Sequence, residues 1–69
     1  MKFNFNYLHY IIKDRGFTVD GFVAHLPMNK STFYRKANKP SRFTYNDICE
    51  IVRILNLKDN EVRTIFFDN

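Results

Sequence analysis

Apolar residues recur at helical spacing along the chain, and short polar segments separate the groups. In the clearest group, Ile48, Ile51, Val52 and Leu55 stand at i, i+3, i+4 and i+7, which is the spacing of one buried face of a helix. The alternation typical of a strand occurs only at residues 3–6. The pattern therefore predicts an all-α fold with five helical segments.

Capping residues stand where these segments begin and end. Asn6, Thr18, Asn29 and Thr44 each carry a side-chain oxygen that can accept a hydrogen bond from the first turn of a helix. Gly16 suits the left-handed position just past the end of the first helix. The first four helices are thus expected to follow these four residues.

Three further features refine the helix boundaries. Phe5 and Tyr10 are spaced as a hydrophobic staple on the first helix, and Asp47, three residues after Thr44, completes a capping box. Pro27 stops or redirects the second helix, which carries Phe22, Val23 and Leu26. The third helix spans residues 30 to about 37, and the fifth opens at residue 58 or 59.

The apolar positions predict one shared core. Besides the stripe on the fourth helix, its expected members are Leu8, Ile12, Phe22, Leu26, Phe33 and Ile65. Phe66 and Phe67 are expected to close this core against the first helix, with the alternative that one ring is exposed for a partner. Cys49 follows the stripe and is expected to be a buried or half-buried small side chain rather than a reactive thiol.

Composition makes packing the main source of stability. The 69 residues are 45% hydrophobic and 17% aromatic and include one cysteine, so no internal disulfide can form and large rings must fill the core. We expect one domain, residues 1–69. No apolar run exceeds three residues, which excludes a membrane-spanning helix and a signal-peptide core. A reduced, intracellular protein is the resulting expectation.

Positive charge is concentrated in one part of the sequence. The formal net charge is +4, yet residues 28–45 contain five Lys or Arg and no Asp or Glu. A local basic region of this kind indicates a polyanionic partner, either nucleic acid or an anionic membrane surface, with a solvated charged loop as the alternative.

The basic region begins at a tight connection between two predicted helices. Only Leu26, Pro27 and Met28 separate them, so the helices must cross steeply. With Phe33 turned inward, the side chains on outward-facing arcs of the third helix are Lys30, Ser31, Tyr34 and Arg35. A helix of this kind fits the major groove of DNA. Flanking phosphates would then lie near Lys36, Lys39 and Arg42.

Residues 18–37 (TVDGFVAHLPMNKSTFYRKA) resemble the helix-turn-helix of the lambda-repressor-like, Cro-type (XRE) DNA-binding family. The continuation through residues 43–45 and 63–67 resembles small phage regulators of Gram-positive hosts. The resemblance implies a compact four- or five-helix domain whose third helix is the recognition helix. Pro27 replaces the family's turn glycine and cannot adopt positive φ, so the turn must differ locally.

The resemblance also assigns expected roles to residues of this chain. Lys30, Ser31 and Arg35 occupy base-reading positions, and Asn29, Thr32 and Asn38 occupy positions that often contact phosphate or neighbouring bases. The second helix, capped by Thr18, would present its first backbone amides to a phosphate.

The expected function is a sequence-specific regulator that binds double-stranded DNA and acts by occupying a phage or prophage operator in the cytoplasm of a bacterial host, in association with the nucleoid. A weak or DNA-induced dimer on a pseudo-palindromic site is expected, using the fifth helix and the termini. The alternative is a protein-interaction module that modulates another repressor. No enzyme activity, metal or cofactor is expected: His9 and His25 are isolated, and no partner residues accompany Asp47 and Glu50.

Overall fold

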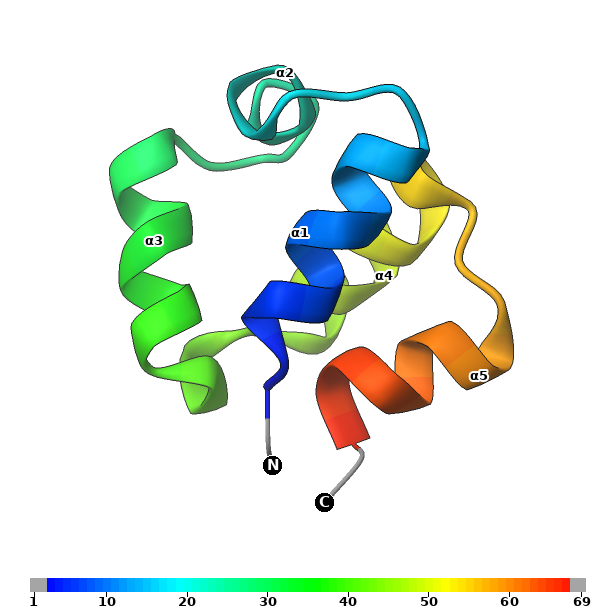
Figure 1. Ribbon diagram of the computed structural model, residues 1–69. Coiled ribbons are helices and arrows are strands. Elements are labelled where there is room, and N and C mark those ends of the chain that lie inside the picture. The colour runs from blue at the N-terminus through cyan, green and yellow to red at the C-terminus, as the bar shows by residue number, and fades with distance from the viewer. Residues whose placement is uncertain (1–2, 68–69) are drawn as a thin grey trace.

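The computed structural model describes residues 3–67, and every regular element in this part of the chain is a helix or a helical turn, without a strand (Figure 1). The elements are α1 (Phe5–Asp14), α2 (Val19–Val23), α3 (Lys30–Asn38), the 3-10 turn η1 (Pro40–Arg42), α4 (Tyr45–Leu55), α5 (Asp59–Val62) and the π-helical turn η2 (Arg63–Phe67), which continues α5 directly. The predicted all-α class and the five helices are confirmed.

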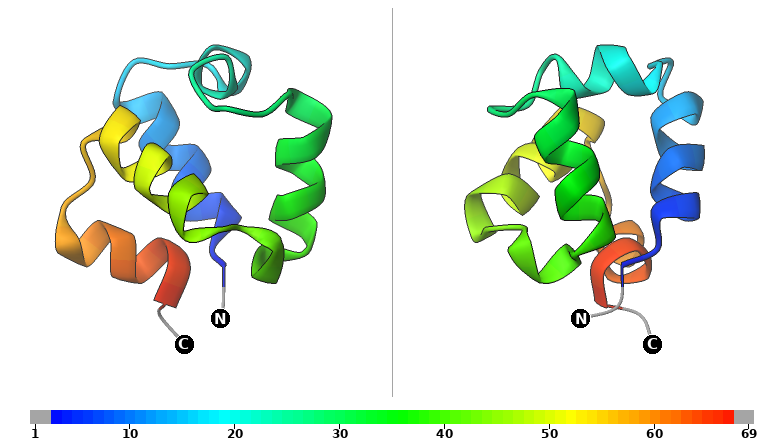
Figure 2. Two further views of the ribbon diagram at one scale, coloured as in Figure 1. Left: turned by 180° about the vertical axis from the view of Figure 1, so that it is seen from behind. Right: turned by 90° about the vertical axis from the view of Figure 1, so that its left-hand side faces the viewer.

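The helices enclose a core from four sides. α1 and α4 lie on opposite faces of the molecule and α3 runs along a third side, while α2 bridges the ends of α1 and α3 (Figures 1 and 2). In Figure 1, α2 is seen along its axis while α3 runs in the plane of the picture, so the two helices cross steeply. η2 packs against α1 and closes the end of the core where the chain enters it.

Most predicted helix boundaries are confirmed. The side chains of Thr18, Asn29 and Thr44 accept hydrogen bonds from the first turns of α2, α3 and α4, and Asp47 completes the capping box on α4. Gly16 follows α1 with φ of +88°, the left-handed conformation that a glycine adopts without strain. The three side-chain caps thus mark where α2, α3 and α4 begin, and Gly16 follows the end of α1.

The predicted start of α1 is wrong. Asn4, not Asn6, is the cap: its Oδ1 accepts a 3.0 Å hydrogen bond from the Tyr7 N–H. The expected staple between Phe5 and Tyr10 is absent as well, because the Phe5 ring turns toward α3 while Tyr10 stacks on Tyr7 and is 61% exposed. The helix thus starts two residues earlier than the sequence pattern suggested.

The end of α2 also differs from the prediction. The helix ends at Val23 rather than reaching Leu26, whose N–H donates to the Val23 carbonyl in a tightened turn before Pro27. Within residues 3–67, positive φ occurs only at Gly16 and Asn56. The connection to α3 is therefore made without a left-handed residue, as the proline required.

Twelve apolar side chains are buried in one core: Leu8, Ile11, Ile12, Phe22, Val23, Leu26, Phe33, Phe43, Ile51, Leu55, Ile65 and Phe66. Ile11, Val23 and Phe43 are buried in addition to the expected members. Phe66 is buried as expected, whereas the Phe67 ring is 55% exposed.

Only two of the four residues in the predicted apolar stripe on α4 are fully buried. Ile51 and Leu55 are buried, but Ile48 and Val52 are half-buried, and Cys49 is exposed where a buried or half-buried side chain was expected. The physical reason is Asp47, which is only 6% exposed: burying its side chain turns that side of α4 inward and the Val52 side outward.

Arg15 ties three helices together at the other end of the molecule. Its Nε donates to the Leu55 carbonyl at 3.2 Å, and its guanidinium binds both Glu61 carboxylate oxygens at 2.8 and 2.9 Å. A hydrogen bond from the Lys58 N–H, followed by those from Arg15, lowers the pKa of Glu61 below its ordinary value. The bidentate geometry fixes α5 against the ends of α1 and α4.

Phe33 lies at the centre of the core and is fully buried. Its ring meets Phe5 from α1, Phe22 from α2 and Phe43 from the segment before α4, with centroid separations of 6.2, 6.0 and 6.3 Å. The planes are strongly inclined, between 57° and 81°, which is the arrangement that the ring quadrupoles favour. One α3 side chain thus sets the position of that helix relative to its neighbours.

We expect Phe33→Ala to lower the free energy of unfolding by about 3–5 kcal/mol, because the variant loses a buried ring and leaves a cavity among three others. Denaturant unfolding measures the change, with Phe67→Ala as the control: its exposed ring should cost about 1 kcal/mol or less. A loss under about 1 kcal/mol for Phe33→Ala would contradict this packing.

Candidate nucleic-acid interface

The side of α3 opposite Phe33 is polar and exposed. The exposed residues Ser31, Arg35 and Asn38 follow one another at i, i+4 and i+7, so they share one strip along the helix. Asn38 belongs to this strip because α3 extends to residue 38, one residue beyond the predicted end. The helix therefore presents hydroxyl, guanidinium and amide groups in a row.

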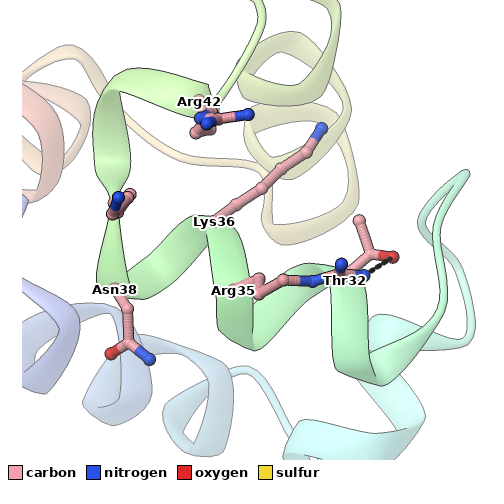
Figure 3. Close-up of a pocket in the computed structure, with 6 residues that line it drawn as sticks. Thr32, Arg35, Lys36, Asn38 and Arg42 are labelled. Atoms are coloured by element: carbon pink, nitrogen blue, oxygen red, sulfur yellow. Dashed lines mark hydrogen bonds between the residues drawn. The ribbon is translucent and has the colours of Figure 1, made fainter.

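An open hollow of about 560 Å³ lies beside this strip, between α3 and η1 (Figure 3). Its lining residues are Thr32, Arg35, Lys36, Asn38, Lys39 and Arg42. All six come from the predicted DNA-binding set. Four of them are cationic, so the hollow has the charge needed to attract an anion.

Ion pairing divides the five cations of the basic region into two groups. Lys30 Nζ lies 3.1 Å from an Asp20 carboxylate oxygen on α2, and Lys36 Nζ lies 2.5 Å from an Asp47 carboxylate oxygen. The other three, which line the hollow, have no acidic partner within residues 3–67: Arg35, Lys39 and Arg42. These three provide the uncompensated charge of this surface.

The Lys36–Asp47 pair is largely buried, with side chains 22% and 8% exposed. Burial by itself would raise the pKa of Asp47, but hydrogen bonds from Lys36 and from Thr44 outweigh it and hold that pKa below its ordinary value. The carboxylate also lies in the first turn of α4, where the helix dipole favours a negative charge. Lys36, predicted as a phosphate contact, is thus bound to α4 in this structure.

Arg35 makes one local contact. Its guanidinium donates to Thr32 Oγ1 at 3.3 Å, one turn earlier on the same exposed face (Figure 3). This single long hydrogen bond steadies the side chain and leaves its other donors available. A guanidinium with free donors in a fixed fork suits guanine edges and phosphates alike.

Five predicted contact residues lie outside the hollow: Thr18, Asn29, Lys30, Ser31 and Tyr34. The side-chain oxygens of Thr18 and Asn29 already accept hydrogen bonds as helix caps. Tyr34 is 38% exposed and meets the Phe5 ring edge-on, with centroids 6.1 Å apart.

Two features of this surface were not predicted from the sequence: the turn η1 and the ion pair between Lys36 and Asp47. η1 turns the chain after α3 and brings Arg42 to the hollow; Pro40, at its first position, was the available signal. The pairing of Lys36 with Asp47 joins residues eleven positions apart on different helices, and no local pattern reports it.

Other chemistry is sparse in the described part of the chain. His9 is half-buried against Phe5, and the exposed His25 meets Phe17 edge-on. Among residues 3–67, no three His, Cys, Asp or Glu side chains lie together as a group that could hold a metal ion. No helix described here combines the length and apolar character that crossing a membrane requires.

Comparison with protein-family models, with curated proteins and with solved structures gives no match to this chain.

We expect Asp47→Asn to lower the free energy of unfolding at pH 7 by about 1–3 kcal/mol, because Lys36 loses a partly buried partner. The folded-state pKa of Asp47 is depressed, so this stabilisation is complete above the unfolded pKa of about 4 and is lost as pH falls below it. Denaturant unfolding between neutral and acidic pH should show the difference between protein and variant shrinking in acid. The matched control is Asp20→Asn, which removes an exposed pair. A difference that stays constant down to acid would contradict the assignment.

Proposed function

We propose that this protein is a sequence-specific regulator that binds double-stranded DNA through α3, in the manner of lambda-repressor-like, Cro-type helix-turn-helix proteins. The observation that carries the proposal is the convergence of Arg35, Lys39 and Arg42, all without acidic partners, on the hollow beside the exposed face of α3. A helix with side chains is narrow enough for the major groove, about 12 Å wide.

The charge pattern supports a polyanion better than a merely solvated surface. Four of the basic side chains in residues 3–67 form ion pairs: Arg15, Lys30, Lys36 and Arg53. The α3–η1 segment nevertheless retains three free cations that line one hollow. Like charges held together without counterions repel one another, and a phosphate backbone removes that repulsion on binding.

In the proposed complex, the strip on α3 faces base edges and the hollow lies over the sugar–phosphate backbone. Arg35 lies on both surfaces, and its free donors suit a bidentate contact to guanine. Lys39 and Arg42 follow the helix and neutralise phosphates. The mechanism is occupancy of an operator, which needs no catalytic group and no cofactor.

One copy makes few base contacts, so the proposed operator is pseudo-palindromic, with half-sites about 34 Å apart. A phage or prophage switch in a bacterial cell is the proposed setting. The competing proposal, a module that binds another repressor protein, predicts indifference to short duplexes.

We expect Arg35→Ala to weaken binding to a selected duplex by about 1–3 kcal/mol, to relax preference at one base pair and to affect scrambled DNA much less. Lys39→Ala and Arg42→Ala should weaken binding to all duplexes alike, each lowering the salt slope by about 0.9. The measurement is titration at several salt concentrations after site selection from random duplexes.

Arg63→Ala is the matched control, since it removes the same charge from an exposed position on η2. Equal losses on both duplexes for Arg35→Ala would make Arg35 a phosphate contact only. A protein that selects no site, and shows no salt-dependent duplex binding, would refute the DNA-binding proposal in favour of the protein-interaction module.

A further inference from the structure

One carboxylate oxygen holds both ends of the chain segment that lines the hollow. Lys36 Nζ on α3 and the Thr44 N–H before α4 both donate hydrogen bonds to Asp47 Oδ2. The chain between these two donors includes η1 and carries Lys39 and Arg42, two of the hollow's cations that have no acidic partner within residues 3–67. We call the three hydrogen-bonded residues, Lys36, Thr44 and Asp47, the clasp.

The clasp closes this segment into a loop of fixed size. Inside the loop, the Arg42 N–H donates to the Lys39 carbonyl at 2.9 Å, and the Phe43 N–H donates to the Pro40 carbonyl at 3.0 Å. Phe43 is buried and its ring meets Phe33. The segment is therefore tied to the core by an aromatic ring and to the start of α4 by the clasp, which together set its position relative to α3.

The charges of the clasp do not themselves favour a polyanion. The Lys36 side chain lines the hollow and extends away from α3 (Figure 3), but it is 22% exposed and paired with an aspartate side chain that is 8% exposed. A carboxylate beside phosphates lowers the affinity for DNA, and a lysine that stays paired with it releases no counterions. On charge alone, Asp47 opposes DNA binding and Lys36 adds little to it.

We propose that Lys36 and Asp47 are positioning residues for DNA binding: the clasp holds Lys39 and Arg42 at the spacing at which the hollow receives backbone phosphates. Lys36 thus acts through these two cations and not by contacting phosphate, as the sequence had suggested. The inference rests on the proposed DNA-binding function. A preorganised site loses affinity when a supporting residue is removed, even though the contacting groups remain.

Asp47→Asn separates positioning from charge, because the two effects have opposite signs. The substitution removes a negative charge, so charge alone would strengthen binding to a duplex. If the clasp positions the cations, the variant should instead bind a selected duplex about tenfold more weakly. Asp20→Asn is the matched control: it removes the same charge from an exposed pair with Lys30, and it should bind as tightly as the natural sequence or more tightly.

Two variants at Lys36 complete the test. The double variant Lys36→Met, Asp47→Asn has the net charge of the natural protein and should also bind about tenfold more weakly. Lys36→Arg retains a cation that can pair with the carboxylate, and it should bind like the natural sequence. The titrations use each variant at pH 7 below the onset of its unfolding, so that a change in stability alone leaves the affinity unchanged.

Backbone order parameters from NMR relaxation supply a readout without DNA. Those of residues 39, 41 and 42 should fall from the value of rigid backbone, about 0.85, toward 0.6 in Asp47→Asn, and they should stay unchanged in Asp20→Asn.

The outcomes distinguish this inference from the proposed function. If the natural protein selects a duplex but Asp47→Asn binds it equally or more tightly, the inference fails alone. A loss in Lys36→Arg as large as in the double variant would also overturn it, because the ammonium and not the pair would then be required. A natural protein that binds no duplex refutes the proposed function. The order parameters then decide the inference: lowered values support a clasp that holds the cations in place, and unchanged values overturn it.

Discussion

The position of α3 depends on one buried ring. Phe33 contacts aromatic side chains from α1, α2 and the segment before α4, so one ring orients the helix that carries the proposed binding surface against three segments. In a chain of 69 residues with one cysteine, no disulfide can supply that rigidity, and dense aromatic packing must do so. The packing of Phe33 therefore also fixes the position of the polar strip, which lies on the opposite side of the same helix.

A second constraint determines which positive charges remain available. Asp47 satisfies the N-terminus of α4 and binds Lys36 at the same time, so one carboxylate both starts a helix and holds the end of α3 against it. The adjacent cations have no such partner within residues 3–67 and remain free to meet an external anion. Within this short basic segment, Lys36 thus contributes to the packing of α3 on α4, and the unpaired cations belong to the proposed binding surface.

Local signals predicted the fold class and most of the architecture. Side-chain caps at Thr18, Asn29 and Thr44 and the glycine at position 16 act over three or four residues, and all four are found where the sequence places them. Errors arose where a distant contact decided the outcome. Asn4 and Asn6 offer the same local cap to α1, and the hydrogen bond from the Asn4 N–H to the Ile65 carbonyl of η2, which accompanies the observed cap, is a contact that no local pattern reports.

The candidate site shows the same division. The helical spacing of apolar residues predicted that Phe33 points inward. The outward-facing positions of α3 could be predicted from that orientation. Asp47 is buried on α4 and forms an ion pair with Lys36 on α3, and both facts depend on how these two helices pack. A hydrophobic pattern assigns charged residues to the surface, so it could not predict that Asp47 is buried.

The hydrogen bond from the Asn4 N–H to the Ile65 carbonyl, 2.7 Å long, joins the first and last described elements of the domain. Its consequence concerns synthesis on the ribosome. α1 is made first, yet the side chains that cover it, Ile65 and Phe66, are made about fifty residues later, about the separation between the two elements in the sequence. At translation rates of about 5–20 residues per second, α1 waits seconds for its cover, whereas helix formation takes about a microsecond or less. Completion of the core is thus timed by translation: α2 can pack on α1 early, but the part of α1 that η2 contacts remains uncovered until η2 has emerged.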